Sequence, residues 1–507
     1  MKFPSTTTAP WVGSLVQHSR HPHNLTVLVR LACGISCLIN ALYALISQFA
    51  IAPTESQDLS PTTMGSGGSR AEEKDSPGFR QYIPDLNSPR FQAAKNQDCY
   101  EYAENFQKSH NPPWLYDLTQ VWQKLLREPY KGLTTDGNVI PNLFKPQDDG
   151  VPIESIVAAV DKVFDQISPE QREKVSFSLN AKEWRAWSNP EILLRPLGLR
   201  LEDLDARVAA SILDVLKATF STEGYEKALA AMRINQYLGQ ICELPKIMNE
   251  LSYNFLIFGT PSKDKPWGWS LYGHHLCLNV FLHGPQIVIS PTFTGAEPNM
   301  IDDGPYVGTE ILHDEGNLGL NLMQSLPGPS QEKAQIFKLL RDPAMLQSGD
   351  LAKDRWNRDD QRHMCGAFRD NRIVPLEGIC VASFTPEQKK LVLDIAYHFV
   401  LYLPDMARKL RLKQVADHLD QTYFCWIGRW GDDDAFYYRI QSSVIIMEFD
   451  HHSGVFLSNT EPEKFHVHTI LRTPNAGDYG AGLRSAEDMV QHLDNGEQFD
   501  RHDPSNP

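Results

Sequence analysis

Three runs of aromatic and β-branched residues in the second half of the chain restrict its fold more than any other feature. They span residues 271–290, 436–449 and 465–471. Such runs are typical of strands in a buried sheet. Helical patterns surround them, with helix-start signals of the form Ser/Thr-Pro-Glu-Gln at residues 168–171 and 385–388. This mixture predicts an α+β fold with a mainly antiparallel sheet and a helical N-terminal part.

Other local patterns give finer expectations. Residues 204–233 carry apolar side chains at helical spacing, with a break near Gly224. Residues 291–298 follow the first strand run directly, and their glycine and proline content predicts a loop. No internal repeat is evident along the chain.

A charge-free segment near the N-terminus, residues 31–52, is long enough to span a bilayer, which needs about 20 residues. Basic residues precede it and acidic residues follow it, so the large domain is expected in the secretory lumen or outside the cell. The predicted organisation is a cytosolic arm (1–30), a transmembrane signal-anchor (31–52), a flexible linker (53–90), a globular domain (91–490) and a disordered tail (491–507).

A cleaved signal peptide is the alternative interpretation of this segment. Ala50-Ile51-Ala52 matches the small-x-small pattern of a cleavage site, and cleavage at about Ala52 would secrete the protein. The arm of about 30 residues before the apolar run is long for a signal peptide, which favours a single-pass anchor.

The overall charge of the 507-residue chain restricts its partners. The formal net charge is -15, and an acidic surface repels phosphate backbones, so no nucleic-acid partner is expected. Six of the eight cysteines lie beyond the apolar segment and are scattered, with no C-x-x-C pair. They are either buried thiols or disulfides of a lumenal domain, and the sequence does not decide between these two states.

The third strand run carries the clearest chemical signal. Side chains on a strand alternate between faces, so His466, His468 and Arg472 share one face. Two imidazoles about 7 Å apart along a strand can converge on one ion or one anion. The alternative is a polar strand face whose histidines are satisfied by hydrogen bonds. Together with His274 and Glu448, the two histidines are the predicted metal ligands.

A second cluster precedes them in the segment WGWSLYGHHL. If His274 and His275 lie on a strand, they point to opposite faces, so only one of them is expected to enter a given site. His275 is the predicted catalytic histidine. The predicted substrate-binding side chains are aromatic, although aromatic residues are as often core residues: Trp267, Trp269, Tyr272 and Tyr438.

Charged side chains near these histidines suggest an anion site. Arg439 and Arg472 are predicted catalytic residues, because an inward arginine on a strand pairs with a carboxylate or binds an anion. Glu297, at the end of the segment PTFTGAE, is a candidate carboxylate ligand or general base, although a lone glutamate in a loop is usually solvated.

The strings WGWSLYGHHLCLN, PTFTGAEP, FYYRIQ, MEFD, HVHTILR and DYG occur in this order. With the segments around Trp184 and Phe220, they resemble the family catalogued as domain of unknown function 3500, over about residues 91–485. The resemblance implies a domain and not a reaction. Members occur in bacteria and filamentous fungi, and some fungal ones are similar to proteins from secondary-metabolite gene clusters. The chain looks like a fungal-type member with an N-terminal anchor outside the matched region.

Three functions are therefore in competition. The first is a membrane-anchored enzyme that uses a divalent metal, zinc or iron, to hydrolyse or oxidise a small organic molecule, plausibly in fungal secondary-metabolite biosynthesis. The second is an enzyme without metal, in which His468 or His275 is a general acid or base. The third is a non-catalytic anchored protein that binds a small molecule or helps to assemble a biosynthetic pathway.

Overall fold

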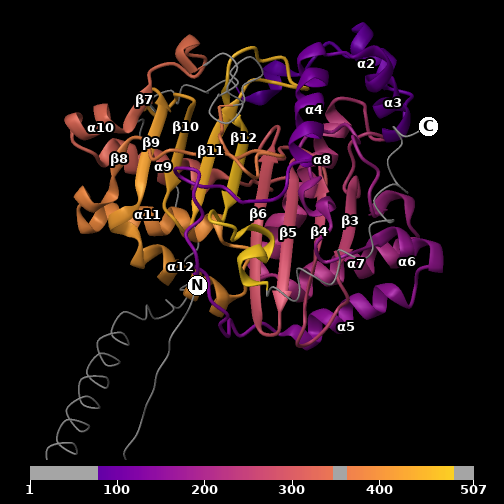
Figure 1. Cartoon of the computed structure of the whole chain (residues 1–507). Helices are drawn as coiled ribbons and strands as arrows, with labels where there is room; N and C mark the ends of the chain where they lie inside the picture. The colour runs from indigo at the N-terminus through magenta and orange to yellow at the C-terminus, as the bar shows by residue number, and fades with distance from the viewer. Residues whose placement is uncertain (1–77, 346–361, 485–507) are drawn as a thin grey trace, which may run out of the picture. The chain divides into compact units, whose positions relative to one another are not determined.

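The structure is a computed structural model that describes residues 78–345 and 362–484 (Figure 1). The predicted arm, signal-anchor and tail, with most of the linker, lie outside the described residues. Within the described ranges, no helix is long and apolar enough to cross a membrane. The six cysteines in these ranges form no disulfide.

Helices and strands alternate in two long series. The helices are α2 (Pro89–Ala94), α3 (Cys99–Ser109), α4 (Pro113–Leu126), α5 (Ile153–Phe164), α6 (Pro169–Val175), α7 (Ala206–Thr219), α8 (Thr222–Ile241), α9 (His313–Ser325), α10 (Gly328–Ala334), α11 (Pro386–Phe399) and α12 (Asp405–Asp417). The strands are β1 (Ser176–Phe177), β2 (Leu199–Arg200), β3 (Tyr253–Phe258), β4 (Pro266–Gly273), β5 (Leu276–His283), β6 (Gln286–Ala296), β7 (Gln335–Phe337), β8 (Ile379–Cys380), β9 (Tyr423–Gly428), β10 (Phe436–Gln441), β11 (Ile446–His452) and β12 (Glu463–Arg472). The short 3-10 turns are η2 (Phe79–Tyr82), η3 (Lys182–Arg185), η4 (Leu201–Asp203), η5 (Pro343–Met345), η6 (Val381–Ser383), η7 (Leu419–Gln421) and η8 (Asp478–Leu483).

All twelve strands join one sheet in the order β1-β3-β4-β5-β6-β12-β11-β10-β9-β7, with β2 beside β3 and β8 beside β9. The pairs are antiparallel except at the two ends, where β1 pairs parallel with β3 and β7 pairs parallel with β9. The predicted α+β class with a mainly antiparallel sheet is therefore confirmed.

The strand order reads the same from both ends, which shows an internal repeat that the sequence does not reveal. The first repeat runs α5-α6-β1-β2-α7-α8-β3-β4-β5-β6, and the second runs α9-α10-β7-β8-α11-α12-β9-β10-β11-β12. Their last strands, β6 and β12, pair antiparallel in the middle of the sheet (Figure 1, pink and yellow).

Glycines with positive φ mark equivalent positions in the two repeats. Gly198 (φ 68°) directly precedes β2, and Gly378 (φ 84°) directly precedes β8. A Cβ at either position would collide with a backbone carbonyl oxygen of the neighbouring strand, that of Phe255 or Phe424. Because the same close approach needs glycine twice, the correspondence of the repeats extends to backbone detail.

One face of the sheet, the helix-covered face, packs on helices of both repeats. Trp267 and Trp269 of β4 and Tyr438 of β10 lie in the same hydrophobic core as side chains of α5, α7, α8, α9, α11 and α12. Apolar stripes on these helices close over alternate residues of every central strand. This core is the larger of the two that cover the sheet.

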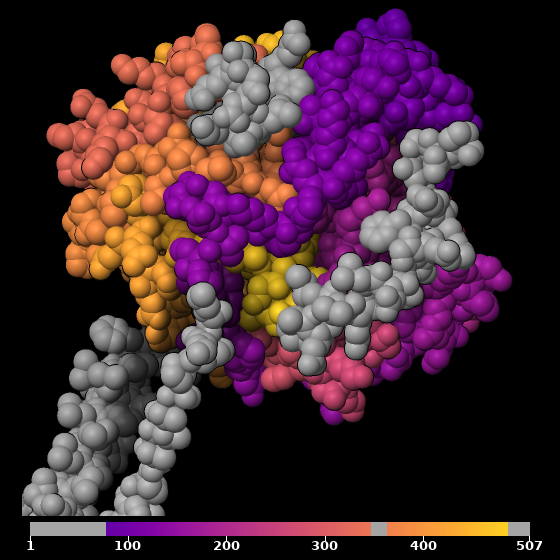
Figure 2. Space-filling model, in the orientation of Figure 1, coloured from indigo at the N-terminus to yellow at the C-terminus, as the bar shows by residue number. Residues whose placement is uncertain are grey.

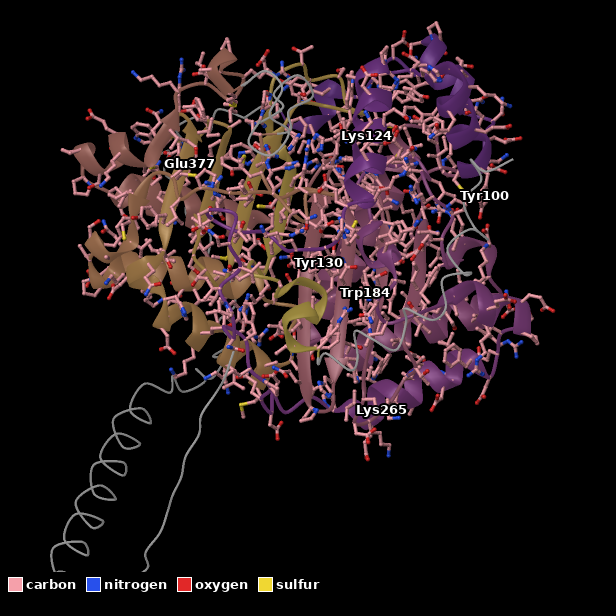
Figure 3. The ribbon with its side chains drawn as sticks, viewed as in Figure 1. Tyr100, Lys124, Tyr130, Trp184, Lys265 and Glu377 are labelled. Atoms are coloured by element: carbon pink, nitrogen blue, oxygen red, sulfur yellow. The ribbon has the colours of Figure 1, made fainter. Side chains whose placement is uncertain are left out.

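The opposite face, the site face, is covered by less regular structure. Its core contains side chains of α3 and α4, of the segment 184–193 and of the segment 364–374. Residues between α4 and α5 also cross this face (Figure 2, indigo to purple), and Thr134 forms a parallel bridge with Ile373. Figure 3 labels two residues of this covering layer: Trp184 stacks on Phe258, and Glu377 binds Arg439.

Several local predictions are confirmed and others are wrong. The helix starts at Ser168 and Thr385 both have a complete capping box. The break in the helical pattern of residues 204–233 falls at Phe220 and Ser221, between α7 and α8. The predicted loop at residues 291–298 is mostly strand, because β6 continues to Ala296 and its backbone pairs with both β5 and β12.

Candidate metal centre

Two consecutive histidines occupy the turn between β4 and β5. His275 has a φ of 61°, and neither His274 nor His275 belongs to a strand. The expectation that they point to opposite faces of a strand is therefore wrong. Their rings stack, with centroids 3.8 Å apart. Only the second ring reaches the histidines of β12, since Nδ1 of His274 is held by Oδ1 of Asn235 at 2.8 Å.

Three imidazoles converge where this turn meets β12. Nε2 of His468 lies 3.1 Å from Nε2 of His275 and 3.2 Å from Nε2 of His466. Nitrogen ligands about 2.0–2.1 Å from a tetrahedral zinc ion are about 3.3 Å apart, so these separations match a metal trio. The three donor atoms lie within 4.8 Å of one another, and all three residues are buried.

The hydrogen bonds of the trio favour a cation over a proton. Nδ1 of His466 lies 2.7 Å from the carbonyl oxygen of Ser453, which can only accept, so Nδ1 carries the hydrogen. Nε2 of a neutral His466 then presents a lone pair. A single N–H of His468 would have to serve both His466 and His275, whereas a divalent cation would give each nitrogen a full bond.

Burial keeps these rings in the form that binds metals. It lowers the pKa of His274 to about 3 and the pKa of His363 to about 4. Burial, with neighbouring imidazoles, also holds the pKa of His275 and of His468 well below the ordinary value. Neutral imidazole is the form that ligates metal ions, so the cluster is ready to bind a cation at neutral pH.

A second group of histidines adjoins the trio. His363, His452 and His468 also place one donor atom each within 4.8 Å of the others. The rings of His452 and His468 have centroids 3.9 Å apart. His363 comes from the covering segment and not from the sheet, so a loop completes this group.

Two buried carboxylates flank the histidines. Oε1 of Glu297 accepts three backbone N–H groups, from Val455, Phe456 and Leu457, at 2.8, 2.9 and 2.8 Å. The same oxygen lies 3.9 Å from Nδ1 of His466. Glu297 thus fixes the loop whose Ser453 carbonyl orients His466, as carboxylates behind metal ligands commonly do.

The second carboxylate, Asp450, belongs to β11 and pairs in register with His468. Its Oδ2 lies 3.0 Å from Nε2 of His452. Its Oδ1 accepts from Nε of Arg362 at 2.9 Å, so the carboxylate is held between a guanidinium and an imidazole.

The predicted metal ligand Glu448 lies on the same face but outside both groups of potential ligands. It accepts hydrogen bonds from the backbone of Met364 (2.6 Å) and Cys365 (2.8 Å) and from the hydroxyl of Tyr437 (2.6 Å). Burial opposes its ionisation, but Arg439, His363 and these hydrogen bonds outweigh that effect and leave its pKa below the ordinary value. Glu448 therefore anchors the covering segment to the sheet.

The two predicted catalytic arginines are bound to internal partners. Arg439 donates to Glu377 at 2.6 Å and to the carbonyl of Pro375 at 3.1 Å. Arg472 donates to Asp478 and to Asp370, both at 2.7 Å. Each guanidinium ties the covering layer to the sheet in the way that bidentate arginines typically do.

The predicted aromatic pocket is divided between the two faces. Trp267, Trp269 and Tyr438 belong to the core of the helix-covered face, on the far side of the sheet from the histidines. Tyr272 alone lies on the site face, where its hydroxyl donates to the carbonyl of Arg195 at 2.9 Å. Beside it, a cavity of about 20 Å³ is lined by Tyr272, His274 and Glu191.

Sequence reasoning missed two members of the cluster. His452 was overlooked as a ligand although it ends β11 next to the strand of His466 and His468, and its position after Asp450 on a strand is a usable signal. His363 lies in a segment without strand or helix periodicity. No local pattern could have placed His363 at the site, because long-range contacts position it.

The fold and the histidine cluster define a two-repeat α+β protein with a candidate metal centre next to the junction of its repeats. The chain belongs to the family described as "Protein of unknown function (DUF3500)", whose model matches residues 149–481. The match spans both repeats and begins later than the predicted residue 91, so it leaves out α2, α3 and α4. No curated protein and no solved structure matches the chain.

Proposed function

We propose that the protein is a metal-dependent enzyme that acts on a small organic molecule, with His275, His466 and His468 as ligands of a zinc or iron ion. The observation that carries this proposal is the convergence of three Nε2 atoms, with separations of 3.1 and 3.2 Å along His275–His468–His466. Three protein ligands with a vacant position for water or substrate are typical of catalytic rather than structural zinc sites.

The chain's own residues have distinct tasks in this proposal. His275, His466 and His468 would hold the metal, which when bound would polarise a substrate oxygen or lower the pKa of a water. Ser453 fixes the orientation of His466 through its carbonyl oxygen, and Glu297 fixes the loop that carries Ser453. The arginines are a weaker part of the sequence-based hypothesis, because their guanidinium groups already bind internal carboxylates.

The small space at the site supports a second candidate function, a non-catalytic binding or assembly protein with a metal that stabilises the fold. The cavity beside His274, about 20 Å³, has room for about one water. His275 and His468 are only 5% and 6% exposed. A substrate larger than water would need the covering layer to move, whereas a structural metal would not.

Metal analysis of the purified full-length protein tests the proposal directly. We expect at least one equivalent of zinc or iron, and we expect its loss in H468Q and H275Q. H274Q is the matched control, since His274 stacks on His275 but is held by Asn235. Full metal content in H275Q, or a metal-free wild-type protein, would overturn the metal assignment. Turnover of a candidate substrate that stops with chelator would separate the enzyme from the binding protein.

We further propose that residues 31–52 anchor the protein to a membrane with the large domain in the secretory lumen, in a pathway that makes small organic molecules. The charge-free run with basic residues before it supports this topology. Carbonate extraction of membranes tests it. We expect the chain to stay in the pellet; release of a fragment that begins after Ala52 would favour secretion instead.

A further inference from the structure

Two adjacent groups of metal-compatible histidines share one residue. The first is His275, His466 and His468, and the second is His363, His452 and His468. Every member of both groups is buried. His468 therefore stands between two sets of donors, one from the β4–β5 turn and β12, the other from β11 and the covering segment.

The nitrogen atoms without hydrogen bonds fall in the second group. Within the part of the chain that the structure describes, Nδ1 of His468 and Nε2 of His363 are buried and have no hydrogen-bond partner. Buried polar atoms normally have a partner, so two unsatisfied nitrogens in one group are unexpected. The third member, His452, directs its Nε2 toward Oδ2 of Asp450 at 3.0 Å.

The chemistry of an imidazole ring decides how both groups could be filled. Each ring nitrogen has one lone pair in the ring plane, so it can bind only one ion. Nε2 of His468 faces His275 and His466 and is committed to the first group. A second ion would have to use Nδ1 of His468, which is the atom that lacks a partner.

We propose that the centre is dinuclear, with His468 as a bridging imidazolate between a divalent transition-metal ion in the first group and another held by His363, His452 and the carboxylate of Asp450. This inference rests on the proposed metal function and extends it. Binding of the second ion releases the remaining ring proton of His468 to solvent. No oxidant or reductant is needed for this step.

The charges around the second position are balanced. Asp450 is paired with Arg362, and Glu448 with Tyr437 and the backbone of the covering segment. The nearest carboxylates and guanidiniums therefore cancel, and the added charge of a divalent ion is offset by the imidazolate and by Asp450. All ligands except His363 come from adjacent strands, which hold donor atoms more rigidly than loops.

The bridge also restricts the chemistry. Two-metal hydrolases hold their ions about 3.5–4 Å apart and clamp the two oxygens of one phosphoryl group between them. An imidazole ring keeps two ions farther apart than that. A shared phosphate oxygen is thus disfavoured, and the geometry favours a substrate that binds one ion while the second tunes the first.

Copper reconstitution of the metal-free full-length protein tests the bridge, since Cu(II) binds nitrogen sites more tightly than the other divalent ions of its row. We expect two equivalents of Cu(II) and an electron paramagnetic resonance spectrum of a spin-coupled pair. H363Q should bind one equivalent and show an uncoupled Cu(II) signal. H283Q is the matched control, because His283 ends β5 as His452 ends β11, and it should keep two coupled ions.

The outcomes separate this inference from the proposed function. One uncoupled equivalent in the wild-type protein, unchanged in H363Q, would overturn the bridge and leave a single-metal site. No bound copper at all would overturn both. If H363Q does not fold, the wild-type spectrum and stoichiometry still decide, because coupling requires two ions on one ring.

Discussion

The two repeats are alike on the helix-covered face of the sheet and differ on the site face. The ladder registers place Trp269 of the first repeat where the second has Tyr438, and both lie in the helix-covered core. On the site face, Ser270 and Asn279 of the first repeat stand where the second has Arg439 and Glu448. One face therefore conserves an apolar packing surface, and the other was free to acquire charge.

This difference follows from what covers each face. Helices of both repeats pack on the helix-covered face, and such packing requires apolar side chains of similar size on both halves. The site face is covered by segments that belong to neither repeat unit's regular elements, such as residues 362–377. Charged strand residues were tolerated there because that segment supplies partners, including Asp370 for Arg472 and Glu377 for Arg439.

The largest expected effect breaks the buried ion network of the second repeat. Arg472, Asp370 and Asp478 are all 0% exposed. R472M leaves two carboxylates buried without their guanidinium, and we expect a loss of about 3–5 kcal/mol in unfolding free energy.

Urea denaturation measures the effect of R472M, with K162M in the first repeat as control. Lys162 and Asp214 form an exposed pair, 55% and 50% exposed, so its loss should cost less than about 1 kcal/mol. Equal losses in the two variants would show that the buried network adds no stability to the second repeat.

Removal of metal is expected to have the next largest effect. A ligand that binds only the folded state stabilises it by about 3–4 kcal/mol when its free concentration is 100–1,000 times its dissociation constant. Chelator should therefore lower the melting temperature of the wild-type protein but leave H275Q unaffected. A matching drop in H275Q would place the ion away from the trio.

The two glycines that precede β2 and β8 offer a symmetric test of the repeat. G198A and G378A each force a side chain into a left-handed backbone and against a carbonyl oxygen. Each should cost about 2–3 kcal/mol. Calorimetry of the two variants checks whether the losses are similar, and a large loss in only one would mean that the two positions are not equivalent.

The smallest expected effect is a difference in acid sensitivity, measured on the metal-free protein. Burial lowers the pKa of His363 to about 4 from an ordinary value near 6.5. The folded state then binds fewer protons than the unfolded state between these values, so stability is complete above about pH 6.5 and falls as the pH drops toward 4.

We expect H363Q to reduce the slope of stability against pH by about 1.4 kcal/mol per pH unit in this window. H283Q, in the half-exposed hairpin end of the first repeat, should leave the slope unchanged. Urea midpoints at a series of pH values measure both. An unchanged slope in H363Q would mean that His363 is accessible to protons in the folded state.

Much of the fold was predictable because it depends on local patterns. Strand alternation placed His466 and His468 on one face, and the proline-led helix starts at Ser168 and Thr385 were read directly from capping chemistry. The repeat was not predictable, since only the helix-covered positions match, and there by size and apolarity rather than by identity.

The sequence by itself determined the class of the fold, the strand face of the β12 histidines and the neutral-to-acidic character that disfavours nucleic acid. Only the tertiary structure decided that His275 rather than His274 reaches those histidines, because a turn with positive φ sets the two rings in a stack and not on opposite faces. It also decided that His363 joins them and that both arginines are already paired. Each of these depends on contacts between segments about 60 to 190 residues apart, which no local pattern encodes.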